Sequence, residues 1–435
     1  MISALPSETD VPTKSIVDST GAVRLAAFRA CVMALMLIVL LLRMRAQTAP
    51  ARAPNNEPIH PEVRIPVTPL GFLPPGDLPA FYYFAMVELH FIDADHLMFA
   101  FNVPRLIKRN DNCPGSDVQR IVHAVVFQLP SGRPLKQVDW ELYDYMDFLW
   151  RSGGGKLLLR RCNQMESIGV DLDPQVLIRG IGTVEDVSFS PDHSILVIQE
   201  KVTPDEEDKH SGDLPSVLAQ ETKTQHTNVS FIGLHPLHMI GRAEISSPSL
   251  IPVTANGLFE VLTAANDQWV VNMRVFHGAE RHIANIHSLC PPLVQAVSNK
   301  MFMVITCSKG DRKSIVGYDL QGSQLWTIPL APEQDDLRLI TIPNGSRFAI
   351  ESLRLKHPRA ALDPLTKEDV DGENIDIYDA HSGVRIATFQ TSPAYTGGQN
   401  VDFSSDGTRI AVLHDGAIEI YSLDELVKAL PRRAH

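Results

Sequence analysis

The sequence predicts an all-β fold: a seven-bladed β-propeller of four-stranded antiparallel blades, preceded by an N-terminal apolar helix. Runs rich in β-formers recur along the chain, two kinds of tight polar turn follow each other in the same order, and seven such copies occupy residues 62–430 as one domain. Four antiparallel strands per repeated unit is the arrangement of a propeller, which leaves only short, protected sheet edges. An ordinary β-sandwich is the alternative, and the ordered recurrence of both turns favours the propeller.

The last copy shows the pattern most clearly. Residues 400–404 (NVDFS) alternate apolar and polar, residues 405–408 form a turn, and residues 409–413 (RIAVL) return as a second strand. A third run, residues 417–423, follows. Asp-Gly between alternating apolar runs is a strong hairpin signal, because glycine adopts the positive φ that such a turn requires.

Six earlier copies align on the same two turns. The expected first turns are residues 93–96, 152–155, 190–193, 265–267, 298–300 and 343–346. The expected second turns are residues 130–132, 172–174, 234–236, 276–278, 320–322 and 380–383.

The seventh copy ends after its third strand, because residues 424–430 (DELVKAL) have the pattern of a short helix. Residues 63–68 (VRIPVT) are rich in β-branched side chains and have no partner strand within their own repeat. We therefore expect this segment to supply the missing outer strand of the last blade and so to remove an open sheet edge.

Two of the turns carry a family resemblance. Residues 190–193 (Ser-Pro-Asp-His) and 405–408 (Ser-Asp-Gly-Thr) each follow an apolar-x-Phe step and resemble the S-P-D-G turn of WD40-like bacterial propellers. Such repeats occur in the periplasmic propeller of the Tol–Pal system. Residues 69–97 also resemble an uncharacterised family of exported propellers. The Gly-His and Trp-Asp dipeptides of true WD40 blades are absent from the repeats.

The N-terminus predicts export. Residues 30–42 are thirteen consecutive apolar residues flanked by arginines. That length suits a signal-peptide core, whereas a membrane span needs about 20 residues. Residues 1–46 are therefore expected to be a signal peptide ending at Ala46 or an N-terminal anchor formed by residues 25–42, and both alternatives stay open. Either alternative predicts a protein that is periplasmic, extracellular or anchored to the membrane. Residues 47–61 are expected to be a Pro- and Ala-rich flexible linker.

The net charge bears on the class of partner, and the cysteines bear on possible disulfides. The chain has 39 Lys and Arg against 51 Asp and Glu, a net charge of −12. This balance argues against a nucleic-acid partner, because nucleic-acid-binding surfaces concentrate positive charge. Four cysteines lie in the predicted propeller, and their three possible pairings cannot be separated from the sequence; they are Cys113, Cys162, Cys290 and Cys307.

Three insertions interrupt the repeat, at residues 102–119, 201–227 and 357–374. Each is expected between the second and third strands of its unit, so all three should emerge on one face of the ring. Long loops on a rigid scaffold often form a binding surface. Solvated excursions without a partner are the alternative, and the sequence does not separate the two.

No catalytic, cofactor-binding or metal-binding residue is predicted. The G-x-S-x-G nucleophile motif is missing, which argues against a propeller peptidase. The acidic run over residues 369–376 lacks the ligand spacing of an EF-hand. The favoured hypothesis is a non-enzymatic scaffold that binds a protein or cell-envelope component through one face of the ring, with no cofactor and with an oligomeric state that the sequence leaves open.

The alternative hypothesis is a metal-dependent, lactonase-like hydrolase with its site in the central channel. Such an enzyme needs several carboxylates that converge from the innermost strands. Glu185, Asp186 and Asp402 are the candidates, since they fall near the start of predicted inner strands. Asp186 and Asp402 occupy equivalent places in their repeats, which indicates a repeated structural hydrogen bond rather than a ligand set.

Overall fold

The computed structural model describes residues 60–74, 87–103, 105, 113, 120–142, 148–201, 227–245, 251–276, 278–309, 312–331, 334–342, 344–357, 366, 369–395 and 398–429. The expected leader, nearly all of the linker and most of the three insertions lie outside these residues. None of the helices in the described ranges has both the length and the apolar character needed to cross a bilayer.

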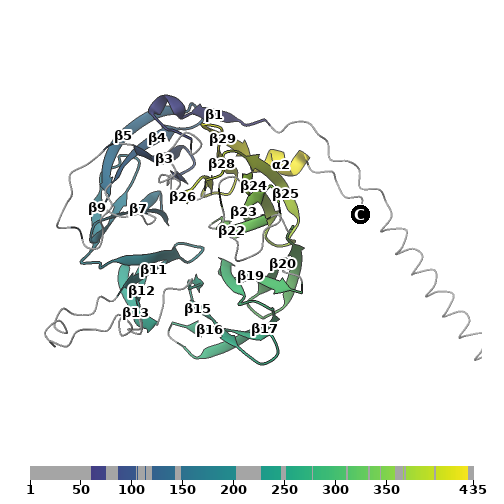
Figure 1. Cartoon of the computed structure of the whole chain (residues 1–435). Coiled ribbons are helices and arrows are strands. Elements are labelled where there is room, and N and C mark those ends of the chain that lie inside the picture. The colour runs from purple at the N-terminus through teal and green to yellow at the C-terminus, as the bar shows by residue number, and fades with distance from the viewer. Residues whose placement is uncertain are drawn as a thin grey trace, which may run out of the picture. The chain divides into compact units, whose positions relative to one another are not determined.

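The described strands form seven sheets, which are the blades of a ring around a central channel (Figure 1). The all-β, seven-bladed propeller is confirmed. In blades 1 to 6 the four strands follow chain order from the channel outwards. Blades 1 to 3 contain β2 Val87–Phe91, β3 His96–Val103, β4 Arg120–Gln128 and β5 Arg133–Leu142; β6 Leu149–Gly153, β7 Lys156–Arg161, β8 Gln164–Ile168 and β9 Gln175–Arg179; and β10 Val184–Phe189, β11 Ile195–Lys201, β12 Thr227–Leu234 and β13 Leu237–Ile245.

Blades 4 to 6 contain β14 Val253–Thr254, β15 Gly257–Thr263, β16 Gln268–Val275 and β17 Glu280–His287; β18 Leu293–Ser298, β19 Met301–Ser308, β20 Arg312–Asp319 and β21 Gln324–Pro329; and β22 Gln334–Thr341, β23 Arg347–Leu355, β24 Val370–Asp379 and β25 Arg385–Thr391. Blade 7 contains β27 Val401–Phe403, β28 Arg409–His414, β29 Ala417–Ser422 and, as its outer strand, β1 Val63–Pro66. A helix, α2 Leu423–Ala429, follows β29 as the sequence predicts.

The N-terminal segment closes the ring. β1 pairs antiparallel with β29, with Val63 opposite Ile420 and Ile65 opposite Ile418. The Val67 amide continues the contact by donating to the Gly416 carbonyl at 2.9 Å. Ile65 is buried in a cluster that also contains side chains of blades 1 and 7. The predicted outer strand is thus present, over residues 63–66, and the segment 62–69 joins two ends of the chain that lie far apart in sequence.

One repeat differs from the prediction. Residues 265–267, expected as the first turn of the fourth copy, connect β15 to β16 and are therefore the link between its second and third strands. The true first strand, β14, is only two residues long. β15 has a stronger strand pattern than the two-residue β14, so the sequence predicted β15 as the first strand of blade 4.

The two faces of the ring carry different connections. Because successive strands in a blade are antiparallel, the links between first and second strands all emerge on one face, which we call the turn face. The links between second and third strands, and those between consecutive blades, emerge on the other, the insertion face. The three insertions connect β3 to β4, β11 to β12 and β23 to β24, so their anchoring strand ends share the insertion face as predicted.

A short additional strand lies inside the ring. β26 Gly398–Gln399 precedes β27 and pairs parallel with Val87 and Glu88 at the inner edge of β2. Glycine is required there, because a Cβ on Gly398 would lie 2.0 Å from the Val87 carbonyl oxygen. The strand links the last blade to the first at the channel and places Gln399 in the channel wall.

Candidate functional site

The first turns of blades 3 and 7 have the same hydrogen-bond pattern. In blade 3 the Ser190 hydroxyl donates to Asp192 Oδ1 at 2.6 Å and accepts from the Ile195 amide at 2.9 Å. In blade 7 the Ser404 hydroxyl donates to Asp406 Oδ1 at 2.6 Å and accepts from the Arg409 amide at 2.9 Å. The resemblance seen in the sequence therefore reflects one local structure, in which serine and aspartate saturate the backbone of a tight turn.

The two turns differ at their left-handed position. Gly407 has φ +72° in blade 7, and Gly345 has φ +66° in blade 6. His193 has φ +55° at the corresponding place in blade 3. A non-glycine residue in this region is strained, and such strain is concentrated at functional sites. The sequence contained this signal as the one departure from S-P-D-G in an otherwise matching turn.

His193 is held uncharged. Burial, and next the positive charge of Arg151, lower the pKa of its imidazole to about 4. The ring hydrogen-bonds to the Arg151 backbone and lies 5.7 Å from the Phe189 ring. His193 Nδ1 is buried without a hydrogen-bond partner among the described residues.

Asp402 joins three blades. It lies on β27 of blade 7, is 3% exposed, and accepts from the Phe91 amide of blade 1 at 2.7 Å. It also forms an ion pair with Arg151 of blade 2, whose side chain is only 9% exposed. Arg151 donates in addition to the Phe403 carbonyl. Asp402 is therefore a structural bridge between the ends of the ring.

The other two candidate carboxylates lie apart from Asp402, on β10. Asp186 accepts from Gln199 Nε2 at 3.0 Å, and Glu185 accepts from the Thr227 hydroxyl at 2.7 Å. These bonds stay within blade 3. The prediction that Asp186 and Asp402 occupy equivalent places is wrong. The matching turns begin at Ser190 and Ser404, so Asp402 corresponds to Ser188, and the expected repeated hydrogen bond does not follow.

The channel contains a cavity of about 340 Å³. Side chains from the inner strands of all seven blades line it, with those of β10 and β22 coming from the halves nearer the turn face. The wall combines apolar groups such as Val187, Val253 and Ile340 with two amides, Gln295 and Gln399. Asp402 is the single carboxylate among the described residues that line it, whereas Glu185 and Asp186 do not.

A buried acidic cluster lies beside the cavity. Glu351 forms an ion pair with Arg338, which also donates to Asn400 Oδ1 at 3.1 Å. Glu373 accepts from Asn400 Nδ2 at 2.7 Å and from the Tyr395 amide at 2.5 Å. Burial, and next the charge of Glu351, raise the pKa of Glu373 to about 8. The positive charge of Arg338 thus lies where it balances the carboxylates of Glu351 and Glu373.

Metal binding receives no geometric support from the described residues. Among them, no group of three or more His, Cys, Asp or Glu side chains is arranged to hold a metal ion. The site that a metal-dependent hydrolase would need is therefore not built from Glu185, Asp186 and Asp402.

The insertion face carries both disulfides. Cys290, in the link between blades 4 and 5, is bonded to Cys307 near the end of β19, with 5.5 Å between the Cα atoms. Cys113, in the first insertion, is bonded to Cys162, in the link between β7 and β8. Of the three pairings that the sequence left open, this one joins neighbouring blades 1 and 2 and ties the link between blades 4 and 5 to blade 5.

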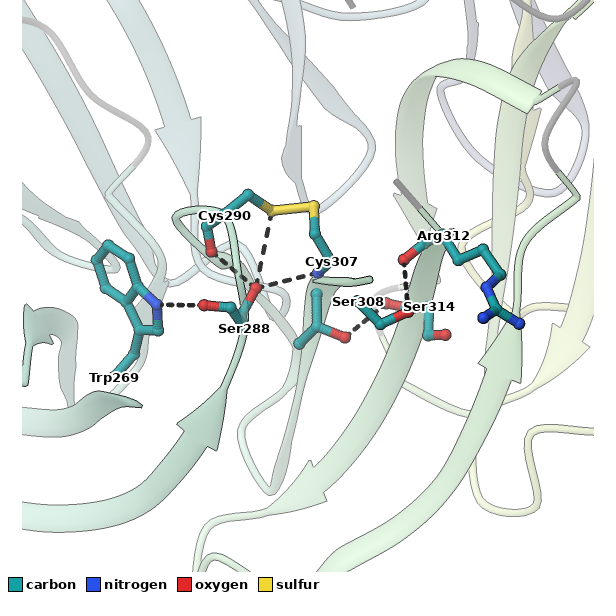
Figure 2. The surroundings of a disulfide bond; sticks show 8 residues. Trp269, Ser288, Cys290, Cys307, Ser308, Arg312 and Ser314 are labelled. Carbon is teal, nitrogen blue, oxygen red and sulfur yellow. Dashed lines mark hydrogen bonds between the residues drawn. A yellow bond between two sulfur atoms is a disulfide. The ribbon is translucent and has the colours of Figure 1, made fainter. Parts of the chain in front are cut away.

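The link around Cys290 is tightly bonded, as Figure 2 shows. The buried Ser288 hydroxyl donates to the Cys290 carbonyl at 2.7 Å and accepts from the Cys307 amide at 3.0 Å. Trp269 Nε1 donates to the Ser288 carbonyl at 2.9 Å. The backbone of the link is thus fixed on both sides of the disulfide.

Three leucines are exposed near this link. Leu289 is 50% exposed, Leu293 41% and Leu262 48%. The Leu289 amide donates to the Cys307 carbonyl at 3.0 Å, and Leu293 pairs with Ile305 of β19. Leu262 lies at the insertion-face end of β15. We call Leu262, Leu289 and Leu293 the leucine patch. The sequence does not predict it, because the exposure of a leucine does not follow from the strand pattern around it.

Comparison with known proteins gives distant likenesses to other propellers. No protein-family model and no curated protein matches the chain. An acylaminoacyl peptidase from Pyrococcus horikoshii matches with 11% identity and a TM-score of 0.48, over 77% of this chain and 49% of that one. The chain therefore spans about half the length of that peptidase.

Two further structures match over more of their length. A chain of the mitotic checkpoint complex matches with 12% identity and a TM-score of 0.44, over 86% of this chain and 97% of that one. A protein assigned as TolB from Agrobacterium tumefaciens matches with 13% identity and a TM-score of 0.38, over 66% and 94%. At these identities the likeness concerns the fold alone.

Proposed function

We propose that the protein is a non-enzymatic, exported propeller that binds a partner protein of the cell envelope through its insertion face. The observation that carries the proposal is the leucine patch, which lies on two neighbouring blades beside a disulfide. Exposed apolar groups gathered on one face of a soluble domain are typical of interaction sites.

The rigidity of the patch supports this role. Leu289 lies between Ser288 and Cys290, whose positions are fixed by the bonds to Trp269 and Cys307. A surface that is ordered before binding loses less conformational entropy on association, so more of the burial energy contributes to affinity. The other exposed apolar side chains mostly lie on outer strands, for example Leu325 on β21 and Leu237 and Met239 on β13.

The disulfides support export. Protein disulfides persist in oxidising compartments and are rare in the reducing cytosol. Both described cysteine pairs are bonded, which agrees with the leader that the sequence predicts. We accordingly propose a periplasmic or extracellular location, with cleavage after Ala46 and retention as an anchor over residues 25–42 as the two ways to reach it.

A channel hydrolase is the less supported alternative. It needs several free carboxylates facing the channel, but among the described lining residues Asp402 is the single one and it is paired with Arg151. An ion-paired carboxylate whose oxygen also accepts a backbone amide is poorly suited to act as a base or a metal ligand.

The binding proposal is tested by affinity capture from the envelope fraction with three forms of the full chain. The wild type and Leu325→Asp are expected to retain the same partner in similar amounts. The double variant Leu289→Asp/Leu293→Asp is expected to retain at least tenfold less. Leu325 is the matched control, because it lies in the same blade with 40% exposure. Equal capture by all three forms would contradict the proposal.

The compartment is tested by thiol labelling of intact cells. In an oxidising compartment, Cys113, Cys162, Cys290 and Cys307 should react with a maleimide only after reduction. The Cys290→Ser/Cys307→Ser variant should lose two of these four modifications. Full labelling without a reductant would place the propeller in a reducing compartment and overturn this part of the proposal.

A further inference from the structure

We infer that the channel cavity is a binding site for a short uncharged peptide segment, recognised through its amide groups by Gln295 and Gln399. This site is separate from the leucine patch and does not depend on the proposed envelope partner. A cavity of about 340 Å³ lies within the size range of small-ligand sites.

The charges of the wall argue for an uncharged ligand. Arg151 is paired with Asp402, Arg338 with Glu351, and His90 with Glu88 at 3.0 Å. His193 is neutral at physiological pH. A charged ligand would have to lose its hydration and compete with these existing pairs, which makes its entry costly.

Two amides in the wall can form hydrogen bonds with a ligand. Gln295 comes from β18 of blade 5, and Gln399 comes from β26 at the inner edge of blade 1. Both are partly exposed. Each carries a carbonyl acceptor and an NH₂ donor, so each can pair with both halves of a peptide group.

The wall offers both polar and apolar surface. Val187, Val253, Ala296, Leu339 and Ile340 line the cavity together with Gln295 and Gln399. A peptide with small apolar side chains satisfies both kinds of surface.

Two features of blade 3 indicate that the wall is built for a purpose. His193 has positive φ where blades 6 and 7 have glycine, so the ring is kept at the cavity despite backbone strain. Ser188 Oγ, in the same wall, is buried without a hydrogen-bond partner among the described residues. Buried polar atoms are rarely left unpaired, and those that are tend to lie at functional sites.

The test is isothermal titration of the full chain with blocked peptides, acetylated at the N-terminus and amidated at the C-terminus. Ac-Val-Ala-NH₂ is expected to bind with a Kd of about 0.1–1 mM, the range of good fragment-sized ligands. The analogues Ac-Val-Lys-NH₂ and Ac-Val-Glu-NH₂ should bind at least tenfold more weakly, and maltose should not bind.

Variants of residues that line the cavity test where the blocked peptide binds. Gln295→Leu and Gln399→Leu are each expected to weaken the blocked peptide at least tenfold, whereas Gln137→Leu, on the exposed outer strand β5, should bind as the wild type. His193→Gly should also weaken it; because glycine is the residue of this turn in blades 6 and 7, this variant is expected to fold.

Three results would overturn the inference. No binding of Ac-Val-Ala-NH₂ up to 10 mM, about tenfold above the expected range, would indicate a solvent-filled channel. Equal binding of the charged analogues, or preferential binding of maltose, would exclude the uncharged-peptide class. Unchanged affinity in Gln295→Leu and Gln399→Leu would place the ligand elsewhere. Competition of the peptide with the captured envelope partner would identify the natural source as a segment of that partner, and lack of competition as a free peptide.

Discussion

The two faces of the ring are stabilised by different chemistry. On the turn face, hydrogen bonds cross between blades: Asn299 Nδ2 of blade 5 donates to Asp192 of blade 3 at 2.7 Å, and Arg347 of blade 6 donates to the Gly407 carbonyl of blade 7 at 2.9 Å. On the insertion face lie the two disulfides. The turn face is therefore held by hydrogen bonds between blades, whereas the insertion face carries the disulfides together with the exposed leucine patch.

The difference indicates which face a partner can bind with the larger gain in free energy. A rigid face with exposed apolar groups offers burial at low entropic cost. This contrast, and not the fold, is the reason to assign binding to the insertion face. Four changes test it, in order of decreasing expected effect.

The largest effect is expected from Asp402→Ala. The substitution removes the acceptor shared by blades 1, 2 and 7 and leaves Arg151 buried without its partner, which destabilises a protein by about 3–5 kcal/mol. Asp186→Ala, on the first strand of blade 3, removes the acceptor of Gln199 Nε2 and should cost about 1 kcal/mol. Urea unfolding followed by tryptophan fluorescence measures both. Equal losses would show that Asp402 is not a special bridge.

The next effect tests the insertion face. Cys290→Ser/Cys307→Ser opens a disulfide between residues 17 apart, and closing a loop of that size stabilises a protein by about 3 kcal/mol. The thermal midpoint of the variant should fall, and a reductant should lower it by less than it lowers that of the wild type. A variant as stable as the wild type would mean that the Ser288 hydrogen bonds fix the link without the disulfide.

The third effect is a pH dependence of the turn face. His193 is neutral in the folded protein, with a pKa lowered to about 4, beside Arg151, Asp192 and His90. The unfolded chain binds a proton near pH 6.5, so the stability from this group is full above that pH and is lost as the pH falls towards 4. By pH 5 the loss is on the order of 1–2 kcal/mol. His193→Gly should remove this part of the acid sensitivity, and an unchanged pH profile would contradict the assignment.

The smallest effect is expected in the shared turn. Asp406→Ala in blade 7 removes the acceptor of the Ser404 hydroxyl and of the Thr408 amide at 3.0 Å, and should cost about 1 kcal/mol. Asp192→Ala in blade 3 should cost more, because Asp192 also accepts from Asn299 across blades. Denaturant midpoints of the two variants, measured side by side, check the order. The reverse order would remove Asn299 from the turn-face network.

The sequence predicted what local pattern controls. Seven repeats, the closing strand at residues 63–68 and the position of the three insertions follow from alternation and turn chemistry, and the structure has them. The fourth repeat failed because β14 is too short to show alternation. Local pattern also could not show that Arg151 reaches Asp402, 251 residues away, or that Cys113 bonds to Cys162 in the next blade. Those contacts exist only once the ring is closed.

The channel shows the same limit. Gln295 and Gln399 are ordinary residues in the sequence, and only the ring brings them to one cavity. His193 is different, because the sequence itself shows histidine where the matching turn of blade 7 has glycine. The histidine at position 193, where the matching turn has glycine, was thus the clearest sign of the channel site in the sequence.

Binding through the insertion face is tested most directly by site-specific photocrosslinking in cells. A photoreactive amino acid is placed in turn at three exposed positions: Leu289 on the insertion face, Ser405 on the turn face and Leu325 on the rim. Binding through the insertion face predicts one discrete crosslinked species from position 289 and none from the other two positions. Crosslinks of equal yield from position 405 or 325, or none from 289, would contradict it.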